Sequence, residues 1–122
     1  MLLIDASSQV IHVGWLRADT APEWRSIERE AGTGLYELLD QLQLSPNEVG
    51  AFAYCEGPGS ILGIRTVATA LRTWVALQPR PIFHYRSLNL LVHTSGQPGA
   101  TLICDARRRS WHAITLDAAG HP

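Results

Sequence analysis

The sequence predicts a single α/β domain whose sheet is partly antiparallel and partly parallel. The start of the chain reads as a hairpin, because the apolar run Leu2–Ile4 and the alternating run Val10–Leu16 flank a polar turn. Further along, the apolar run Ala51–Cys55 passes through a glycine-rich turn into a long helical pattern. Helical segments then separate the later strands, and such crossovers join parallel strands. At 122 residues, 46% hydrophobic and 17% charged, the chain fits one globular domain.

In the first half, three strands precede the first helix. Trp24–Glu28 is predicted as the third strand, at an edge of the sheet, and Gly32–Gly34 as a break after it. The leucines of Leu35–Leu42 recur at i, i+3, i+4 and i+7, which predicts an amphipathic helix. Ser45–Glu48 resembles a capping box with proline at the first helical position, so we expect one short helical turn there.

The second half alternates short strands with two helices. Ser60 is a natural N-cap for a helix that begins at Ile61 and must end before Pro79. The apolar face predicted for this helix consists of Ile61, Ile64, Val67, Ala68, Leu71, Trp74 and Val75. The later elements are the strand Pro81–Tyr85, a helix capped by Ser87 that runs to Val92, and the strands Ala100–Cys104 and Ser110–Leu116. The full order is βββαβαβα, followed by two more strands.

Composition excludes several classes of function. The net charge of −1 argues against independent nucleic-acid binding, which usually comes with a strongly basic surface. The chain contains no lysine, which excludes Schiff-base chemistry through a lysine amine.

Cys55 and Cys104 end apolar runs and are predicted to be buried thiols in a reducing compartment. The apolar start reaches Asp5 too soon for a secretory signal, and no apolar run approaches the ~18 residues of a membrane span, so we expect a cytoplasmic protein.

The segment Cys55–Thr73 joins a strand, a glycine turn and a helix N-terminus, which together can hold a phosphate through unpaired N–H groups. It is not a P-loop, because Gly57 and Gly63 are one residue too far apart and Arg65 stands beyond the position of the lysine. The simpler alternative is a tight connection between strand and helix. The residues predicted to face a phosphate or nucleotide are Asp5, Ser7, Gly57, Pro58, Gly59 and Ser60.

Motifs for catalysis or metal binding are missing from the sequence. No two of the five histidines are four residues apart, as a helical metal motif requires. Ser60 does not match the G-x-S-x-G nucleophile elbow, and neither cysteine belongs to a Cys-x-x-Cys pair. Glu56 is expected to be a solvated loop carboxylate, and the alternative is a contact between Glu56 and a ligand. The sequence therefore predicts no catalytic residue and no metal site.

One basic cluster stands out near the end of the chain. Arg107, Arg108 and Arg109 follow Asp105 in a predicted hairpin turn. Charges in such a turn are usually just solvated, and the alternative is a contact between these arginines and RNA. Three arginines alone would supply a salt-sensitive and nonspecific contribution to nucleic-acid binding.

Four stretches together resemble the TsaB (YeaZ) family, whose members are bacterial partners in the threonylcarbamoyladenosine modification of tRNA. The segment GPGSILGIRTVATALRTW is similar to the family's GPGSFTGLR-type segment, with Ile61-Leu62 in place of Phe-Thr. The other three stretches, in the family's order, are LLIDASSQVIHVGW, NEVGAFAY and ICDARRRSWH. The resemblance implies a ribonuclease-H-like lobe of the actin/Hsp70/hexokinase-type ATPase superfamily.

The same resemblance implies a domain organisation and the place of a ligand site. Because family members carry two lobes, residues 1–98 are expected to form the N-terminal lobe and residues 99–122 the start of a truncated second lobe. In this fold class the first turn, here Asp5 and Ser7, faces the phosphates of a nucleotide. In the TsaB family the equivalent site resembles an ATPase site but is generally regarded as degenerate. An ordinary Asx-turn at Asp5 is the alternative.

By this resemblance the chain is a noncatalytic partner protein without a cofactor of its own. It is expected to dimerise with itself or with a TsaD-like enzyme, with a TsaE-like ATPase as a further partner, and to reach tRNA only through that complex. No contact with a membrane is expected. The alternative is a nucleotide-binding ATPase or kinase-like fragment that uses ATP and magnesium. The expected partner surface is Leu35, Leu38, Leu39, Leu42, Leu62, Arg65, Thr66, Thr69, Arg72 and Thr73.

Overall fold

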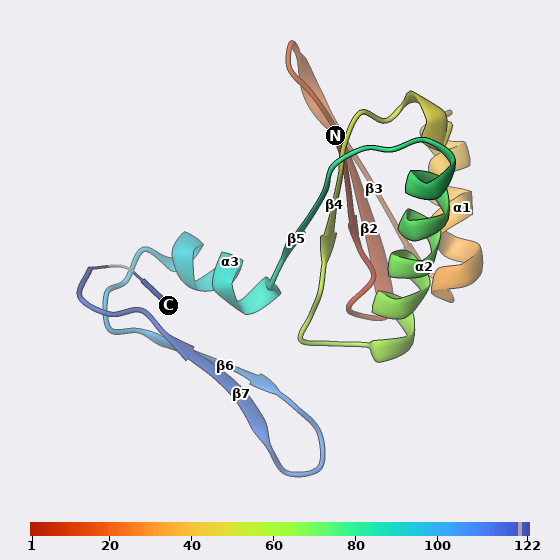
Figure 1. Ribbon diagram of the computed structural model, residues 1–122. Coiled ribbons are helices and arrows are strands. Elements are labelled where there is room, and N and C mark those ends of the chain that lie inside the picture. The colour runs from red at the N-terminus through yellow and green to blue at the C-terminus, as the bar shows by residue number, and fades with distance from the viewer. Residues whose placement is uncertain (120) are drawn as a thin grey trace.

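A five-stranded mixed sheet forms the centre of the protein. A computed structural model describes residues 1–119 and 121–122 (Figure 1). The strands of this sheet are β1 (Leu2–Asp5), β2 (Val10–Arg17), β3 (Thr20–Glu28), β4 (Phe52–Cys55) and β5 (Ile82–Tyr85). They lie in the order β3-β2-β1-β4-β5, with β1, β2 and β3 antiparallel and β1, β4 and β5 parallel. The predicted mixed α/β sheet and the edge position of β3 are confirmed.

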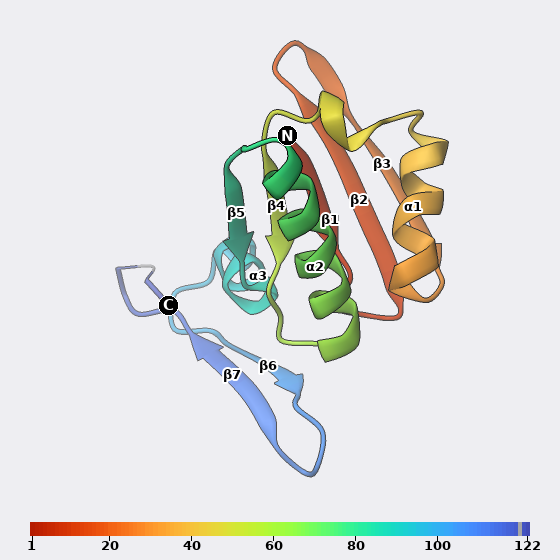
Figure 2. The ribbon, with the colours of Figure 1, turned by 45° about the vertical axis from the view of Figure 1, so that its right-hand side comes forward.

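Helices lie on both sides of this sheet. Two of them, α1 (Ala31–Gln41) and α2 (Ile61–Leu77), lie side by side on one face, and α3 (Ser87–Ser95) lies on the opposite side (Figures 1 and 2). The short 3-10 helix η1 (Pro46–Glu48) precedes β4 and has the predicted capping box. In that box a Glu48 carboxylate oxygen accepts the Ser45 N–H at 2.8 Å.

The core lies between the sheet and the layer of α1 and α2. Alternate strand residues meet the inner faces of the two helices, and this set includes Leu2, Ile4, Ile11, Val13, Leu35, Leu38, Phe52, Val67 and Leu71. The Trp74 ring of α2 packs on Phe52, with ring centroids 5.5 Å apart. Full burial of one such side chain contributes about 1.5–3 kcal/mol, so this layer supplies most of the apolar stabilisation.

Arg80, which follows α2, joins three segments of the chain. Its guanidinium donates to the carbonyl oxygens of Pro46, of Val49 at 3.0 Å and of Trp74 at 2.8 Å. Trp74 lies in the last turn of α2, where a cation is favoured by the negative end of the helix dipole. The side chain therefore holds η1 against the end of α2.

A second, smaller sheet lies away from the first. Its strands β6 (Thr101–Asp105) and β7 (Trp111–Thr115) pair antiparallel and pack against α3, whose Leu88 and Val92 are buried (Figure 2). The two sheets are separate within the described part of the chain. The domain boundary at residue 98 would fall between α3 and β6, and the assignment of residues 99–122 to a second lobe stays a prediction.

Two helices begin at a residue other than the predicted one, and α3 continues to Ser95, three residues beyond the predicted Val92. α1 begins at Ala31, so Gly32–Gly34 lie inside the helix instead of interrupting it. A side chain at Gly34 would come within 2.6 Å of Ile11, so the glycine is there because the helix approaches β2 closely. Ser87 is the first residue of α3 rather than its cap, because the chain turns into the helix at Arg86.

Two predictions of burial are also wrong. Ile61 is exposed, because the first turn of α2 extends past the packed part of the sheet and lines an open cleft. Cys104 is half-buried, because β6 belongs to a sheet of two strands with little to cover it, whereas Cys55 is buried as expected. Across the described residues, no helix has the combined length and apolar character that crossing a membrane requires.

Candidate functional site

The carboxyl ends of β1, β4 and β5 lie side by side, because parallel strands end at the same edge of a sheet. The turn at residues 6–9 follows β1, and the turn at residues 56–60 follows β4. In α/β sheets this edge is where ligands usually bind. It is therefore the first candidate site.

The glycine turn after β4 is shaped by its contact with the turn after β1. The Ser60 N–H donates to the Ser7 carbonyl at 2.7 Å. A side chain at Gly59 would overlap that carbonyl oxygen, and one at Gly63 would overlap the Ala6 carbonyl oxygen. Both glycines are thus required by the close approach of two backbones. Ser60 is the predicted N-cap, since its Oγ accepts the Gly63 N–H at 3.2 Å, and two donors that were expected to serve a phosphate are already used.

Asp5 is held by its neighbours rather than presented to a ligand. One carboxylate oxygen accepts the Ser7 N–H at 2.9 Å and the Ser7 hydroxyl at 2.6 Å, which is an Asx-turn. The other oxygen accepts the Tyr85 hydroxyl at 3.2 Å. Burial, and after it the negative charge of Asp5, raises the pKa of the Tyr85 hydroxyl above its usual range. Tyr85 therefore keeps its proton and remains a donor to Asp5 at neutral pH.

A cleft of about 840 Å³ opens beside this edge, between the first turn of α2 and the tip of the β6–β7 hairpin. The hairpin side of the cleft includes Arg107 and His112. The opposite side includes four of the six residues predicted to face a phosphate, namely Ser7, Pro58, Gly59 and Ser60. The structure thus brings Arg107, the first residue of the arginine cluster, and the glycine turn to the same cleft, which the sequence did not indicate.

The remaining two predicted residues, Asp5 and Gly57, lie outside the lining of the cleft. Asp5 is engaged by Ser7 and Tyr85, as described above. Gly57 has a φ of 111°, a conformation that favours glycine, and its carbonyl accepts the Ser87 N–H at 3.0 Å. Both residues therefore shape the edge of the sheet and do not contribute to the cleft wall.

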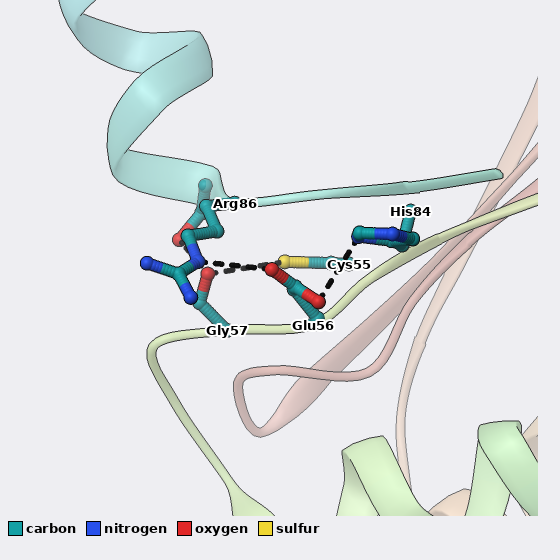
Figure 3. A network of polar contacts seen from close by, with 6 residues as sticks. Cys55, Glu56, Gly57, His84 and Arg86 are labelled. Carbon is teal, nitrogen blue, oxygen red and sulfur yellow. Dashed lines mark hydrogen bonds and ion pairs between the residues drawn. The ribbon is translucent and has the colours of Figure 1, made fainter. Parts of the chain in front are cut away.

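Glu56, which lines this cleft, contacts a basic side chain on each side, His84 and Arg86 (Figure 3). Its carboxylate oxygens lie 3.0 Å from His84 Nδ1 and 2.9 Å from Arg86 Nε. Glu56 is thus paired, and not the solvated loop carboxylate that the sequence suggested. All three side chains are partly exposed, and such pairs contribute about 0–1 kcal/mol each. Their effect is to tie the turn after β4 to the end of β5.

Sequence reasoning missed His84, Tyr85 and Arg86 at this edge. The available signal was their place at the end of a predicted strand that follows the glycine segment, because neighbouring parallel strands end together. Within residues 1–119 and 121–122, no group of three His, Cys, Asp or Glu side chains is placed to hold a metal ion.

The second candidate site is the outer face of α1 and α2, and here part of the prediction is wrong. Leu35, Leu38 and Leu39 are 0%, 0% and 3% exposed, because the leucine stripe of α1 faces the protein's own sheet. Leu42 also packs against the core. The predicted residues that remain accessible are all on α2, namely Leu62, Arg65, Thr66, Thr69, Arg72 and Thr73. From α1, the half-exposed Tyr36 lies beside them, with its ring edge-on to Trp74 at 6.3 Å.

Solved structures with a similar fold include two proteins from Pseudomonas aeruginosa. An uncharacterized protein with similarity to peptidase YeaZ is 21% identical with a TM-score of 0.71. YeaZ itself is 20% identical with a TM-score of 0.70. Each alignment covers 98% of this chain and 60% of the other, so the chain spans about three fifths of the length of these proteins. No curated protein matched the sequence.

A family model described as "TsaD: tRNA N6-adenosine threonylcarbamoyltransferase" matches residues 28–119, well over half of the chain. The match begins at the end of β3 and ends after β7, so it includes both helices of the core layer, the glycine turn and the hairpin. The resemblance drawn from the four sequence stretches is thereby confirmed, and the YeaZ structures share the predicted α/β fold. The chain belongs to the TsaD family and has the fold of YeaZ.

Proposed function

We propose that this chain is a noncatalytic, TsaB-like partner protein that supports the threonylcarbamoyl modification of adenosine 37 in tRNA. It dimerises with itself or with a TsaD-like enzyme, and that enzyme supplies nucleotide binding, metal and chemistry. The observation that carries the proposal is the TsaD family match over residues 28–119. The strand-end site supports the noncatalytic role, because Asp5 has hydrogen-bond donors on both carboxylate oxygens.

The outer face of α2 supports a helical partner. Thr66 Oγ1 donates to the Leu62 carbonyl at 2.8 Å, and Thr73 Oγ1 donates to the Thr69 carbonyl at 3.0 Å. Because these hydroxyls bond to their own helix, Thr66 and Thr73 need no polar partner across an interface. Leu62, 69% exposed, adds an apolar contact. Tyr36, Leu62, Thr66, Thr69 and Thr73 together are called the helical surface below.

Size-exclusion chromatography with light scattering tests this role. The wild-type chain is expected to be a homodimer that gives way to a 1:1 complex when the TsaD-like protein of the same organism is added. Thr73→Glu puts a charge into that interface at a position with no arginine three or four residues away along α2, and should weaken association by about 2–3 kcal/mol, roughly a hundredfold. A wild-type monomer that ignores the TsaD-like protein would overturn the proposal.

The matched control is Thr94→Glu on α3. Thr94 is also an exposed helical threonine whose hydroxyl donates to its own helix, at the Leu91 carbonyl 2.9 Å away. It lies on the opposite side of the sheet from the helical surface, so association should be unchanged. Equal loss in both variants would mean that the glutamates act through folding, which circular dichroism of each variant would reveal.

A second candidate, a nucleotide-binding fragment of the same fold, is favoured by one observation. The cleft of about 840 Å³ at the strand ends has Ser7 and Gly59–Ser60 in its wall. Isothermal titration of the chain with ATP and magnesium separates the two functions. Micromolar, metal-dependent binding that disappears in Asp5→Ala would favour the nucleotide-binding function, whereas no binding is expected of the partner protein.

A further inference from the structure

We propose that the β6–β7 hairpin binds single-stranded RNA directly, with Arg107, Arg108 and Arg109 on backbone phosphates and Trp111 stacked against a base. The inference rests on the proposed function, because a tRNA-modifying complex supplies the RNA. It replaces the expectation that this chain reaches tRNA only through its partner. Five observations, taken in turn, carry it.

Charge is segregated along the chain, although the net charge is −1. Residues 1–79 carry nine acidic residues against five arginines, whereas residues 80–122 carry two aspartates against five arginines. Three of those five arginines stand together at the tip of the hairpin. The argument from net charge against nucleic-acid binding therefore does not apply to this part of the chain, where a polyanion would meet a local excess of positive charge.

The hairpin loop holds the three arginines in an unusual backbone conformation. Arg107, Arg108 and Arg109 have φ values of 63°, 49° and 60°, in the left-handed region that side chains other than glycine rarely adopt. The loop is closed by the Asp105 carboxylate, which accepts the Arg107 N–H at 2.7 Å, and by the Ser110 N–H, which donates to the Arg107 carbonyl at 3.0 Å. Such strained conformations concentrate at functional sites.

The three guanidinium groups lack partners of their own. Within the described residues, none of them takes part in an ion pair or a side-chain hydrogen bond, and all three residues are exposed. By contrast, the arginines of the first strands and the turn after them pair with acidic residues, as in Arg17 with Glu23 and Arg29 with Glu37. The hairpin arginines thus keep their full hydrogen-bonding capacity for phosphate oxygens, which suit the guanidinium fork.

An exposed aromatic ring lies directly beside the arginine loop. Trp111 pairs with Asp105 at the start of β7 and is 64% exposed. On the same face of the hairpin, Ile103 is 62% exposed and pairs with Ala113. An aromatic side chain next to unpaired arginines is the combination with which proteins bind single strands, because bases stack on the ring while cations hold the backbone.

The cleft gives the strand a path away from the hairpin. Arg107 and His112 line its hairpin side, and Gln9 offers a polar side chain on the other side, where the Ser8 hydroxyl already donates to the Val10 carbonyl and Ser60 Oγ accepts the Gly63 N–H. Trp111 is outside the cleft lining, and alternation along β7 places its side chain on the face opposite to His112, so a strand stacked on Trp111 would cross the arginine tip to reach this polar wall. A duplex keeps its bases stacked on one another, so it cannot use the ring, and a single strand is the occupant that satisfies both features. The proposed function makes that single strand RNA.

Fluorescence anisotropy with a labelled single-stranded RNA, compared with a duplex of the same length, tests the proposal on the full chain. Wild type should bind the single strand more tightly than the duplex. The triple variant R107Q/R108Q/R109Q should bind weakly, and the slope of log K against log salt should fall by about 2, since each phosphate contact on a single strand contributes about 0.7. The matched control is R17Q/R25Q/R29Q, which removes the same charge from exposed arginines elsewhere.

The aromatic contact has its own test. Trp111→Ala should weaken single-strand binding at least fivefold while leaving duplex binding and the salt slope unchanged, because stacking on an aromatic side chain is lost. Trp111→Phe retains a ring and should recover most of the affinity. Thermal melts should show that all variants are folded, because the substituted residues are exposed and lie outside the core.

Three results would overturn the inference. They are absence of single-strand binding at low salt, equal losses in the two triple variants, or equal binding of single strand and duplex.

The same variants are also mixed with the TsaD-like protein. A complex that forms without RNA binding by the hairpin would leave the proposed function intact, whereas RNA binding without any complex would overturn the proposed function alone. Loss of the complex in Trp111→Ala, with RNA binding retained, would make the hairpin a protein interface instead.

Discussion

At the residue scale, the contact between Gly63 and the Ala6 carbonyl predicts a severe effect of a small change. Gly63→Ala places a methyl group where that oxygen lies, so two backbones have to separate. We expect the free energy of unfolding to fall by about 2–3 kcal/mol, despite the better helix propensity of alanine. Urea denaturation measures it, with Gly50→Ala as the control, because nothing lies within 4 Å of a side chain at Gly50. Equal stability of the two variants would contradict the close approach.

The pair of Tyr85 and Asp5 predicts a pH dependence. The raised pKa means that the folded state holds the Tyr85 proton more tightly than the unfolded state, whose tyrosines titrate near the usual value of about 10. The wild-type free energy of unfolding should therefore decline as pH rises above about 10, and Tyr85→Phe should decline less steeply. At neutral pH this variant should be about 1–2 kcal/mol less stable, because Asp5 loses a donor. If the free energy of unfolding of wild type and of Tyr85→Phe fell equally with rising pH, the raised pKa of Tyr85 would be refuted.

The same residues show what sequence reasoning could reach. Gly57, Gly59 and Ser60 were identified as a turn and a cap from residue type alone, because backbone freedom and capping are local properties. That Gly59 and Gly63 touch the turn after β1 depends on a contact between segments some fifty residues apart, which a pattern of neighbours does not contain. The engagement of Asp5 by Tyr85 escaped prediction for the same reason.

At the scale of elements, the cap of α2 predicts a graded effect. Ser60→Ala removes the acceptor for the Gly63 N–H and should cost about 1 kcal/mol of stability, whereas Ser60→Asp should keep most of it. Ser87→Ala at the start of α3 should cost less than Ser60→Ala, because Ser87 is not a cap and its hydroxyl makes only one long hydrogen bond, to the Gly57 carbonyl at 3.4 Å. Thermal unfolding of the three variants tests this ranking. A larger loss from Ser87→Ala than from Ser60→Ala would contradict the assigned helix start.

The element α1 shows how a correct pattern led to a wrong surface. The spacing of its leucines predicted an amphipathic helix, and the helix is there. An apolar stripe at that spacing belongs first to the protein's own core, and Leu35 and Leu38 are fully buried in it. A partner of this helix layer would have to contact residues of the opposite face, such as Tyr36, which no apolar periodicity singles out.

At the scale of the whole molecule, the order of elements was readable from the sequence because each strand and helix has its own local signal. The mixed pairing of β1, β2 and β4 also followed, since crossover helices impose parallel strands. The cleft between α2 and the β6–β7 hairpin did not follow, because it depends on how two sheets are placed around α3. The arginine cluster and the glycine turn thus appeared as unrelated motifs in the sequence.

The clamp made by Arg80 has a consequence for how the molecule opens. A helix C-terminus normally frays one residue at a time, but here one side chain is shared by the last turn of α2 and by η1. Neither segment can unfold locally without releasing the other. The last turn of α2 and η1 therefore form one cooperative unfolding unit, which directly precedes β4 in the case of η1. Amide hydrogens in both segments should consequently exchange with solvent in step, although they are about thirty residues apart in the chain.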